Sequence, residues 1–396
     1  MYNPEELLKA SRGIQDRLTE LRRKIHQYPE LGFQEVETAR LVAQELRHLG
    51  LEVRERVGVT GVVGKLGNGH PCIALRADMD ALPIQEENDV PYASKREGLM
   101  HACGHDAHVA GLLGAAMLLT KNPPATGQVR FLFQPSEEGA DEEGKSGAAR
   151  MIEDGAMEGV DAVVGLHTDV DLTTGRVGLR SGPFMAAADR FRIAIRGAAC
   201  HAAHPHRGVD AIVLAAQAIL AMQTVISRKV SPIEGRVITV GTIHGGVRSN
   251  VVAELVEMEG TIRSFSPEVR ETLKAGLENA CKIVEPLGGS YTLQVLDGYP
   301  VTVNNPTMTH LVQEVAQEML GAGEVVEVEA KMGAEDFSLL AEQAPGCFFR
   351  LGVTPPGQPP RPGHSSTFDV DERALPVGAA VLAGVALRFL EGKAGR

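Results

Sequence analysis

The sequence predicts an α/β protein made of two domains, one inserted into the other. The chain has 396 residues, more than the roughly 250–300 residues at which a single hydrophobic core stops growing. Strand-like segments alternate with helical segments, which favours a layered α/β/α domain around a mostly parallel mixed sheet. Between residues 187 and 298 the order of elements changes, and the alternation resumes after Tyr299.

The N-terminal segment is expected to be helical. Apolar residues recur at helical spacing over residues 7–28 and again over residues 35–49. Gly50 follows the second segment, at the position where glycine commonly ends a helix. Two helices are therefore predicted before the first strand.

Four apolar segments then have the length and composition of buried strands. They cover residues 59–66, 72–77, 129–134 and 162–166, with the turn Gly67-Asn68-Gly69 between the first two. Helical segments separate the later ones. This alternation is the basis for the mostly parallel sheet.

The inserted segment has a different order of elements. Strands are expected over residues 190–195, 236–243, 253–263 and 290–296, and helices over residues 210–227 and 267–285. This βαββαβ order is that of the ferredoxin-like unit. The predicted domains are therefore residues 1–186 with 299–396, and an inserted domain over residues 187–298.

Composition limits the class of partner. The chain has 39 Lys and Arg against 51 Asp and Glu, a formal net charge of −12. This acidic balance disfavours nucleic acid or an anionic membrane as a partner, because both require a basic surface. We expect neither.

The chain is also expected to be cytoplasmic. Its first 23 residues mix both signs of charge and lack the apolar core of a secretory signal. The longest apolar stretches, residues 109–119 and 377–387, are shorter than the roughly 20 residues that span a bilayer. The five cysteines are scattered and odd in number, so they are expected to be reduced thiols.

The densest chemical signal is the segment His101-Ala102-Cys103-Gly104-His105-Asp106-Ala107-His108. Residues two apart in an extended segment share a side, so Cys103 and His105 could both face one metal ion. Asp106 is predicted to cap the helix that follows. The alternative is a capped helix start with solvated histidines.

Acidic residues and two further histidines follow predicted strands or loops. Glu137 and Glu138 are adjacent, and two buried carboxylates are costly unless a cation shares their site; the alternative is a solvated acidic turn. Asp80 lies two residues after Asp78, where both could contact a metal or support a ligating histidine. His167 ends a strand and His364 ends the proline-rich loop 355–362, although either histidine could be an ordinary polar residue.

These motifs resemble a known family. The chain is similar to aminoacylase and carboxypeptidase-type amidohydrolases, which include hippurate hydrolases, N-acetyl-diaminopimelate deacetylases and plant auxin-conjugate hydrolases. The resemblance covers nearly the whole chain and is carried by His26-Gln27-Tyr28-Pro29-Glu30-Leu31, Arg76-Ala77-Asp78-Met79-Asp80, the cysteine–histidine segment, Glu335-Asp336-Phe337 and His364.

The resemblance implies a set of site residues. It implies two divalent metal ions held by Cys103, His105, Glu138, His167 and His364, with Glu137 as general base. Asp80 is expected to support the site and Asp78 is left as a group in its surroundings. Zn²⁺ or Mn²⁺ is expected, and Co²⁺ or Ni²⁺ would suit the same ligands.

The resemblance also implies roles for the inserted domain. His201 is expected to stabilise the carbonyl oxygen, while Asn250 and Arg263 are expected to bind substrate; Arg263 could equally be an ordinary cation at a strand end. The inserted domain is expected to mediate dimerisation, in a homodimer or a homotetramer. Cys200 stands where the family usually has glycine, and the acidic segment 140–146 is longer than usual, so the acyl preference stays open.

The expected activity is hydrolysis of the amide bond of an N-acyl amino acid or short peptide. Two metal ions roughly 3.5–4 Å apart can activate one water, with Glu137 taking its proton. A dipeptidase or aminopeptidase on the same scaffold and a non-catalytic metal-binding protein are the alternatives. A serine hydrolase is disfavoured because the chain has no G-x-S-x-G motif.

Overall fold

The computed structural model describes residues 2–392, which form two compact units. Unit 1 comprises the described residues of Met1–Gly182, Val303–Glu329 and Asp336–Arg396, and unit 2 comprises Pro183–Thr302 and Ala330–Glu335. Each unit has a hydrophobic core of its own.

Unit 1 is built on an eight-stranded mixed sheet, as predicted. The order across the sheet is β1 (Glu52–Val57), β2 (Gly61–Gly67), β4 (Gln128–Gln134), β3 (Cys72–Asp78), β5 (Ala162–Thr173), β14 (Gly346–Thr354), β6 (Val177–Leu179) and β13 (Val325–Glu327). The central strands β4, β3, β5 and β14 run parallel to one another. Their C-terminal ends therefore lie at one edge of the sheet.

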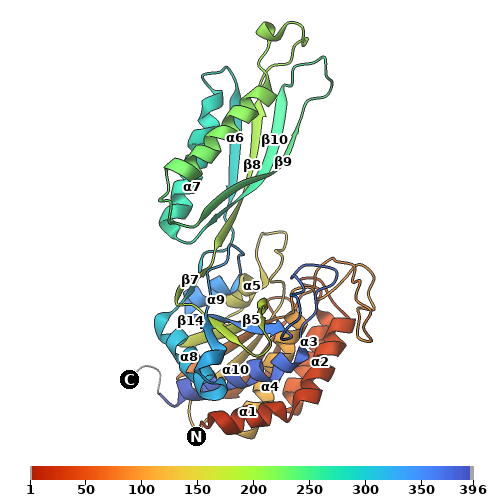
Figure 1. Ribbon diagram of the computed structural model, residues 1–396, viewed down its shortest axis with the longest axis vertical. Coiled ribbons are helices and arrows are strands. Elements are labelled where there is room, and N and C mark those ends of the chain that lie inside the picture. Colours follow the sequence, from red (N-terminus) through yellow and green to blue (C-terminus); the bar gives the residue numbers. More distant parts are fainter. Residues whose placement is uncertain (1, 393–396) are drawn as a thin grey trace. The chain divides into compact units, whose positions relative to one another are not determined.

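Helices cover both faces of this sheet (Figure 1). They are α1 (Pro4–Arg12), α2 (Gln15–Gln27), α3 (Val36–His48), α4 (His105–Lys121), α5 (Gly147–Glu153), α8 (Pro306–Leu320), α9 (Phe337–Gln343) and α10 (Leu375–Leu390). Helices α4 and α10 pack on each other and on β3, whereas α5 and α9 pack on each other and on β4 and β14 respectively. The result is the predicted α/β/α arrangement.

The pair α4 and α10 can lie close to the sheet because both helices are rich in small residues. A Cβ on Gly114 would lie 2.8 Å from the Cβ of Ala379, which is too close for an ordinary contact. Nearly every residue of α4 is buried, as expected for a helix that is apolar on all sides.

Three sequence-based boundaries were wrong or incomplete. The helix predicted over residues 7–28 is two helices, because the chain turns at Gly13 and Ile14. Glycine weakens a helix interior, and the break lets α1 pack on α10 while α2 packs on α4. Strand β1 was not predicted, and β5 runs to Thr173 rather than ending at Leu166.

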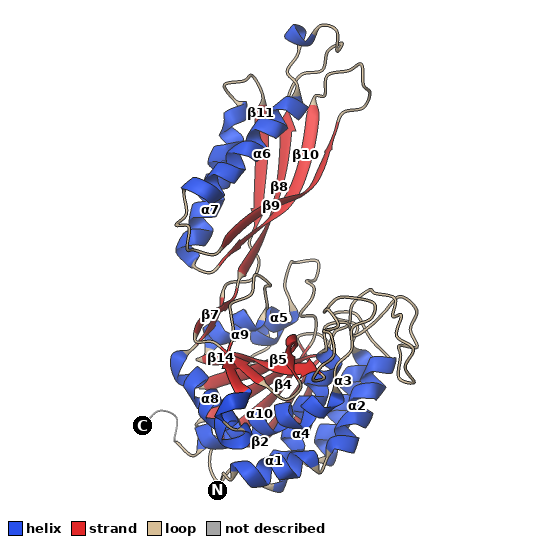
Figure 2. Cartoon of the chain, in the orientation of Figure 1, coloured by secondary structure: helices blue, strands red, loops and turns tan. Residues whose placement is uncertain are grey.

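Unit 2 has the predicted ferredoxin-like order (Figure 2). Its antiparallel sheet has the order β11 (Ser290–Leu296), β8 (Ala187–Arg196), β10 (Leu255–Ser264) and β9 (Arg236–Gly245). Helices α6 (Ala211–Arg228) and α7 (Pro267–Cys281) pack on each other and on this sheet. The remaining short strands β7 (Gly182–Met185) and β12 (Thr302–Asn304) pair with each other. Dimerisation through unit 2 stays a prediction.

Two helical segments are long and apolar enough to cross a membrane by length and composition alone. They are Glu372–Leu390, whose most apolar stretch is 78% buried in the fold, and Ala211–Arg228, whose most apolar stretch is 33% buried. Core helices of globular domains share this length and composition, and both segments pack within their own units.

Candidate metal centre

The candidate residues of unit 1 gather beyond the C-terminal ends of its parallel strands, where ligands of open α/β sheets commonly bind. Asp78 ends β3 and Asp80 follows it; Glu137 and Glu138 follow β4. His167 lies within β5. The long connection after β14 contains His364, and α4 begins at His105.

A first group of ligand atoms comes from Cys103, His105 and His167, which all lie within 4.8 Å of one another. The Cys103 Sγ is 3.4 Å from the His167 Nε2. The His167 Nδ1–H donates to the carbonyl oxygen of Thr168 at 2.7 Å, which leaves the Nε2 lone pair facing the thiol. Gly104 allows this approach, because a Cβ there would lie 2.4 Å from the Thr168 Oγ1.

A second group comes from Cys103, Glu138 and His364, again with all ligand atoms within 4.8 Å. The His364 Nε2 is 3.0 Å from the Glu138 Oε1. His364 has a left-handed backbone with a φ of 59°, and its N–H donates to the carbonyl oxygen of Ala102 at 2.8 Å. The two groups therefore share a single thiol.

Asp80 contacts one candidate ligand from each group. The His105 Nδ1–H donates to the Asp80 backbone oxygen at 2.8 Å, and the Asp80 Oδ1 lies 3.2 Å away. The Asp80 Oδ2 accepts from the Glu138 N–H at 3.0 Å. The His105 Nε2 is then buried, with no hydrogen-bond partner among the described residues. A buried nitrogen left in this state is expected to have a ligand.

Asp78 is engaged by other residues. Its Oδ1 accepts from the His108 Nδ1 at 2.6 Å, and its Oδ2 accepts from Arg76 at 2.6 Å. Because the His108 Nε2 accepts from the Thr168 N–H at 2.9 Å, the proton of that ring is on Nδ1. Asp78 is therefore a buried negative charge, and its Oδ2 lies 3.6 Å from the His105 Nε2.

The charges at this site favour a bound cation. Burial raises the pKa of the Cys103 thiol to about 12, so the thiol alone would stay protonated at neutral pH. Burial lowers the pKa of His105, but the Asp78 carboxylate and Cys103 outweigh it and hold that pKa well above its usual range. A metal ion would replace these protons, since coordination deprotonates a thiol. Sulfur, nitrogen and oxygen donors together suit a transition metal such as Zn²⁺.

Glu137 is 7% exposed and belongs to a further group with His105 and Glu138, whose ligand atoms lie within 4.8 Å. Each residue of that group can offer a ligand atom, but Glu138 also belongs to the group containing Cys103 and His364. Glu137 belongs to neither of the two groups that contain Cys103.

Glu35 is a functional candidate that sequence reasoning missed. Ser136 precedes the acidic pair and has an uncommon φ of 42°. The buried Glu35 carboxylate accepts from the Ser136 N–H at 2.8 Å and from the Thr60 hydroxyl at 2.5 Å. A carboxylate from the N-terminal part of the chain thus holds the turn that directs Glu137 and Glu138. Only its closeness to the motif at residues 26–31 could have singled it out.

We expect Glu35→Gln to remove part of the pH dependence of stability. Burial raises the pKa of Glu35 from 4.5 to about 7, so between these values the folded protein keeps a proton that the unfolded chain releases. The free energy of unfolding therefore falls as the pH rises through this window, by about 3 kcal/mol for this group. Urea unfolding between pH 4.5 and 8 measures the slope.

The matched control is Glu37→Gln, which changes a carboxylate on α3 that pairs with Arg96 at the surface. It should keep the slope of the unchanged protein. Equal slopes for Glu35→Gln and the unchanged protein would show that Glu35 does not titrate in this window.

The capping role predicted for Asp106 was wrong. Gly104 is the N-cap of α4, in a left-handed conformation, and no side chain caps it. Asp106 lies in the first turn and turns its carboxylate to Arg22 and His26 on α2. Arg22 is 84 residues from Asp106, so the sequence around Asp106 gives no sign of this contact.

The predicted substrate residues lie in unit 2. His201 and Asn250 belong to neighbouring loop segments, where the Ala202 N–H donates to the Asn250 carbonyl oxygen at 3.0 Å. Arg263 lies near the other end of β10, opposite Ala188 of β8. Arg263 lies eight positions after the first residue of β10, roughly 25 Å at strand spacing. Within unit 2 the structure brings His201 and Asn250 together, but not Arg263.

Comparisons with known proteins find related chains. A family described as peptidase family M20/M25/M40 matches residues 74–388. Thermostable carboxypeptidase 1 of Saccharolobus solfataricus is 43% identical over 97% of this chain and 98% of its own length. N-acetyl-L-cysteine deacetylase of Bacillus subtilis is 40% identical over 96% of this chain and 89% of its own length.

A solved structure shows the same fold. The Bacillus subtilis YXEP protein, described as a dinuclear metal-binding peptidase of the M20 family, has a TM-score of 0.84 and 35% identity to this chain. The similarity covers 96% of this chain and 99% of the other.

Proposed function

Because the chain belongs to peptidase family M20/M25/M40, a family of hydrolases, we propose that it cleaves the amide bond of N-acyl amino acids with the help of two divalent metal ions. The proposal includes short peptides with a free terminal carboxylate as substrates. The relatives support this class, because one is named a carboxypeptidase and another an N-acetyl-L-cysteine deacetylase.

One observation carries the proposal. Two three-residue groups of ligand atoms share the Cys103 thiol, one completed by His105 and His167 and the other by Glu138 and His364. A single closed structural site would not need two groups. The shared thiol favours a pair of ions over one ion, with Zn²⁺ or Mn²⁺ expected and Co²⁺ or Ni²⁺ suited to the same donors.

In the proposed reaction, the cations and the residues of the chain have separate roles. When bound, two divalent cations would lower the pKa of a water and polarise the amide carbonyl. The Glu137 carboxylate takes a proton from the attacking water and returns it to the leaving amide nitrogen. The C–N bond breaks, and the products are a carboxylic acid and an amino acid with a free amine.

Neighbouring residues bury the Glu137 carboxylate and fix the backbone on both sides of it. Its 7% exposure places the carboxylate in a medium where charge interactions are stronger than in water. The Glu35–Ser136 hydrogen bond sets the backbone from which Glu137 projects. Asp80 accepts a hydrogen bond from the backbone N–H of the adjacent Glu138, which fixes the chain on the other side of Glu137.

A substrate panel tests the function. N-acetyl, N-benzoyl and longer N-acyl amino acids, together with unblocked dipeptides, would be assayed with a chelator and then with added Zn²⁺ or Mn²⁺. We expect turnover of the N-acyl substrates, loss of turnover with chelator and recovery with metal, because the cations activate the water. Turnover of the unblocked dipeptides alone would identify a dipeptidase or aminopeptidase instead. No hydrolysis of any substrate would favour a non-catalytic metal-binding protein.

A further inference from the structure

A buried cluster on α2 has no role in the chemistry described above. Arg22 and His26 lie one helical turn apart, so they project from the same face of α2. Arg22 is 0% exposed and His26 is 1% exposed. His26 belongs to the motif at residues 26–31 that supports the family resemblance, yet it is not one of the candidate ligands.

The Arg22 guanidinium joins two segments that carry candidate ligands. Its Nε donates to the Asp106 Oδ2 at 2.7 Å, and its Nη2 donates to the Asp369 Oδ1 at 2.9 Å. Asp106 directly follows His105, and Asp369 lies five residues after His364. One side chain therefore ties the start of α4 to the segment after the proline-rich loop.

His26 makes a second connection between the same segments. Its Nδ1 lies 2.7 Å from the Asp106 Oδ2, and its Nε2 lies 3.2 Å from the Glu86 Oε1. Asn88 then donates to the Glu86 Oε1 at 3.0 Å and to the Phe368 carbonyl oxygen at 2.9 Å. Both residues of α2 thus reach the segment containing His364 by different routes.

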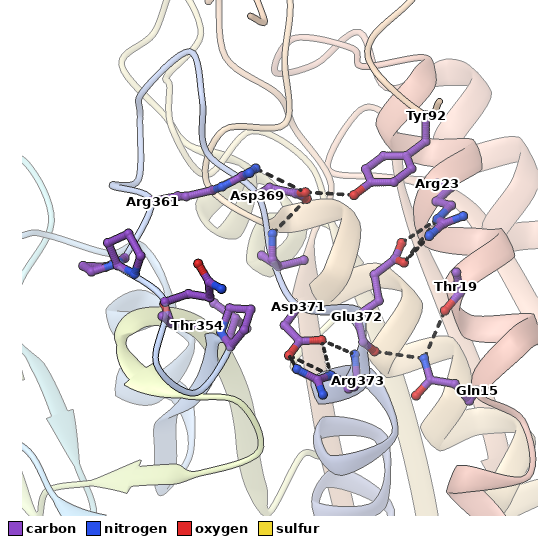
Figure 3. A pocket seen from close by; sticks show the side chains of 16 residues that line it. Gln15, Thr19, Arg23, Tyr92, Thr354, Arg361, Asp369, Asp371, Glu372 and Arg373 are labelled. Atoms are coloured by element: carbon purple, nitrogen blue, oxygen red, sulfur yellow. Dashed lines mark hydrogen bonds and ion pairs between the residues drawn. The ribbon is translucent and has the colours of Figure 1, made fainter. Parts of the chain in front are cut away.

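Solvent reaches the outer side of this cluster. Asp369 and Glu372 line a cavity of about 820 Å³, where Tyr92 and Arg361 contact Asp369 and Arg23 contacts Glu372 (Figure 3). The side chains of Asp369 and Glu372 are 14% exposed, whereas those of Arg22 and Asp106 are 0% exposed. Arg22 is therefore fully buried, whereas the neighbouring Arg23 lies at the surface. Both arginines contact Glu372.

A gain in folding stability does not by itself explain a buried arginine at this position. A buried ion pair commonly adds little compared with apolar side chains of the same size, because both charges lose their hydration. The planar guanidinium, however, donates in fixed directions and so fixes the relative positions of two carboxylates more strictly than a flexible ammonium does. The geometry of Arg22 is thus suited to positioning.

We propose that Arg22 is a positioning residue that aligns His105 and His364, so that the two ligand groups sharing Cys103 form together. The inference rests on the proposed function, because it concerns the metal centre of that function. Arg22 acts through Asp106 and Asp369 and does not itself approach the ions or the substrate.

Metal titration tests this role. The chelator-treated, reduced full-length protein would be titrated with Co²⁺ alone, whose absorption spectrum reports thiolate coordination, and melting temperatures would be measured in parallel. We expect the unchanged protein to bind two equivalents. Arg22→Lys keeps the charge but loses the planar fork, so both equivalents should bind about tenfold more weakly, as for other residues that orient metal ligands.

Two further variants separate positioning from folding. Asp369→Asn weakens the direct contact of Arg22 with the segment after His364, along with the contacts of Tyr92 and Arg361, and leaves the contact of Arg22 with Asp106 in place. It should therefore weaken one equivalent about tenfold and leave the other unchanged. Arg23→Met removes a surface arginine that contacts Glu372 but not Asp106, and it should bind Co²⁺ like the unchanged protein. Asp369→Asn decides the question if Arg22→Lys fails to fold.

The outcomes are distinct. Two equivalents bound with unchanged affinity by Asp369→Asn and by any folded Arg22→Lys would overturn the positioning role, even if the melting temperatures fall. Fewer than two equivalents in the unchanged protein would instead contradict the two-metal function.

Discussion

Glu137→Gln is expected to lower kcat by about 10²–10⁴-fold, the usual contribution of a general base, while the protein still binds two metal ions. The amide has nearly the same shape as the carboxylate, but it cannot take the proton of the attacking water. Glu137 is buried beside His105 and Glu138, so no bulk solvent base can readily replace it. Steady-state kinetics on an N-acyl amino acid, with metal content measured on the same sample, give both quantities.

Glu138→Gln is the matched comparison, because it changes the adjacent carboxylate in the same way. It should release metal, since Glu138 belongs to the group with Cys103 and His364. Near-normal turnover of Glu137→Gln at full metal content would remove Glu137 from the mechanism. Loss of metal from Glu137→Gln would make it a ligand instead.

Cys103→Ala should have the largest effect on metal binding. The two groups of candidate ligands have only this thiol in common, so its removal takes one donor from each. We expect both affinities to fall by more than the roughly 10–100-fold that accompanies loss of a residue orienting a ligand, and hydrolysis to be lost with them. Calorimetric titration with Zn²⁺ would measure the affinities.

Cys200→Ala is the control for this prediction. It removes a partly exposed thiol of unit 2 and should leave both affinities as they are. Retention of one tight equivalent by Cys103→Ala would mean that the thiol serves one ion only, and retention of two would separate Cys103 from the metal centre altogether.

Local pattern was sufficient to predict much of the fold. The alternation of apolar segments predicted the mixed sheet, and the change of order after residue 187 predicted the βαββαβ unit; both are seen in the structure. Such predictions succeed because strand and helix periodicity depend on neighbouring residues. They fail where packing decides, as at Gly13, where the chain breaks one amphipathic segment into two helices.

The candidate ligands were accessible to sequence reasoning for a similar reason. Cys103, Glu138 and His167 stand at or beside the ends of elements that the periodicity predicts, and parallel strands bring such ends to one edge of a sheet. Their types indicate metal chemistry before any distance is known. Their roles as ligands stay a proposal, supported by the two groups that share Cys103.

Sequence by itself therefore determined the alternation of elements and the motifs that carry the family resemblance, because both depend on residue types at short spacing. The resemblance in turn implied the candidate metal ligands. Only the tertiary structure decided what surrounds those ligands. Glu35 reaches Ser136 across 101 positions, and Arg22 joins Asp106 to Asp369 across 263. No periodicity encodes such partners, since a buried charge is satisfied by whichever segment the packed fold brings within hydrogen-bond distance.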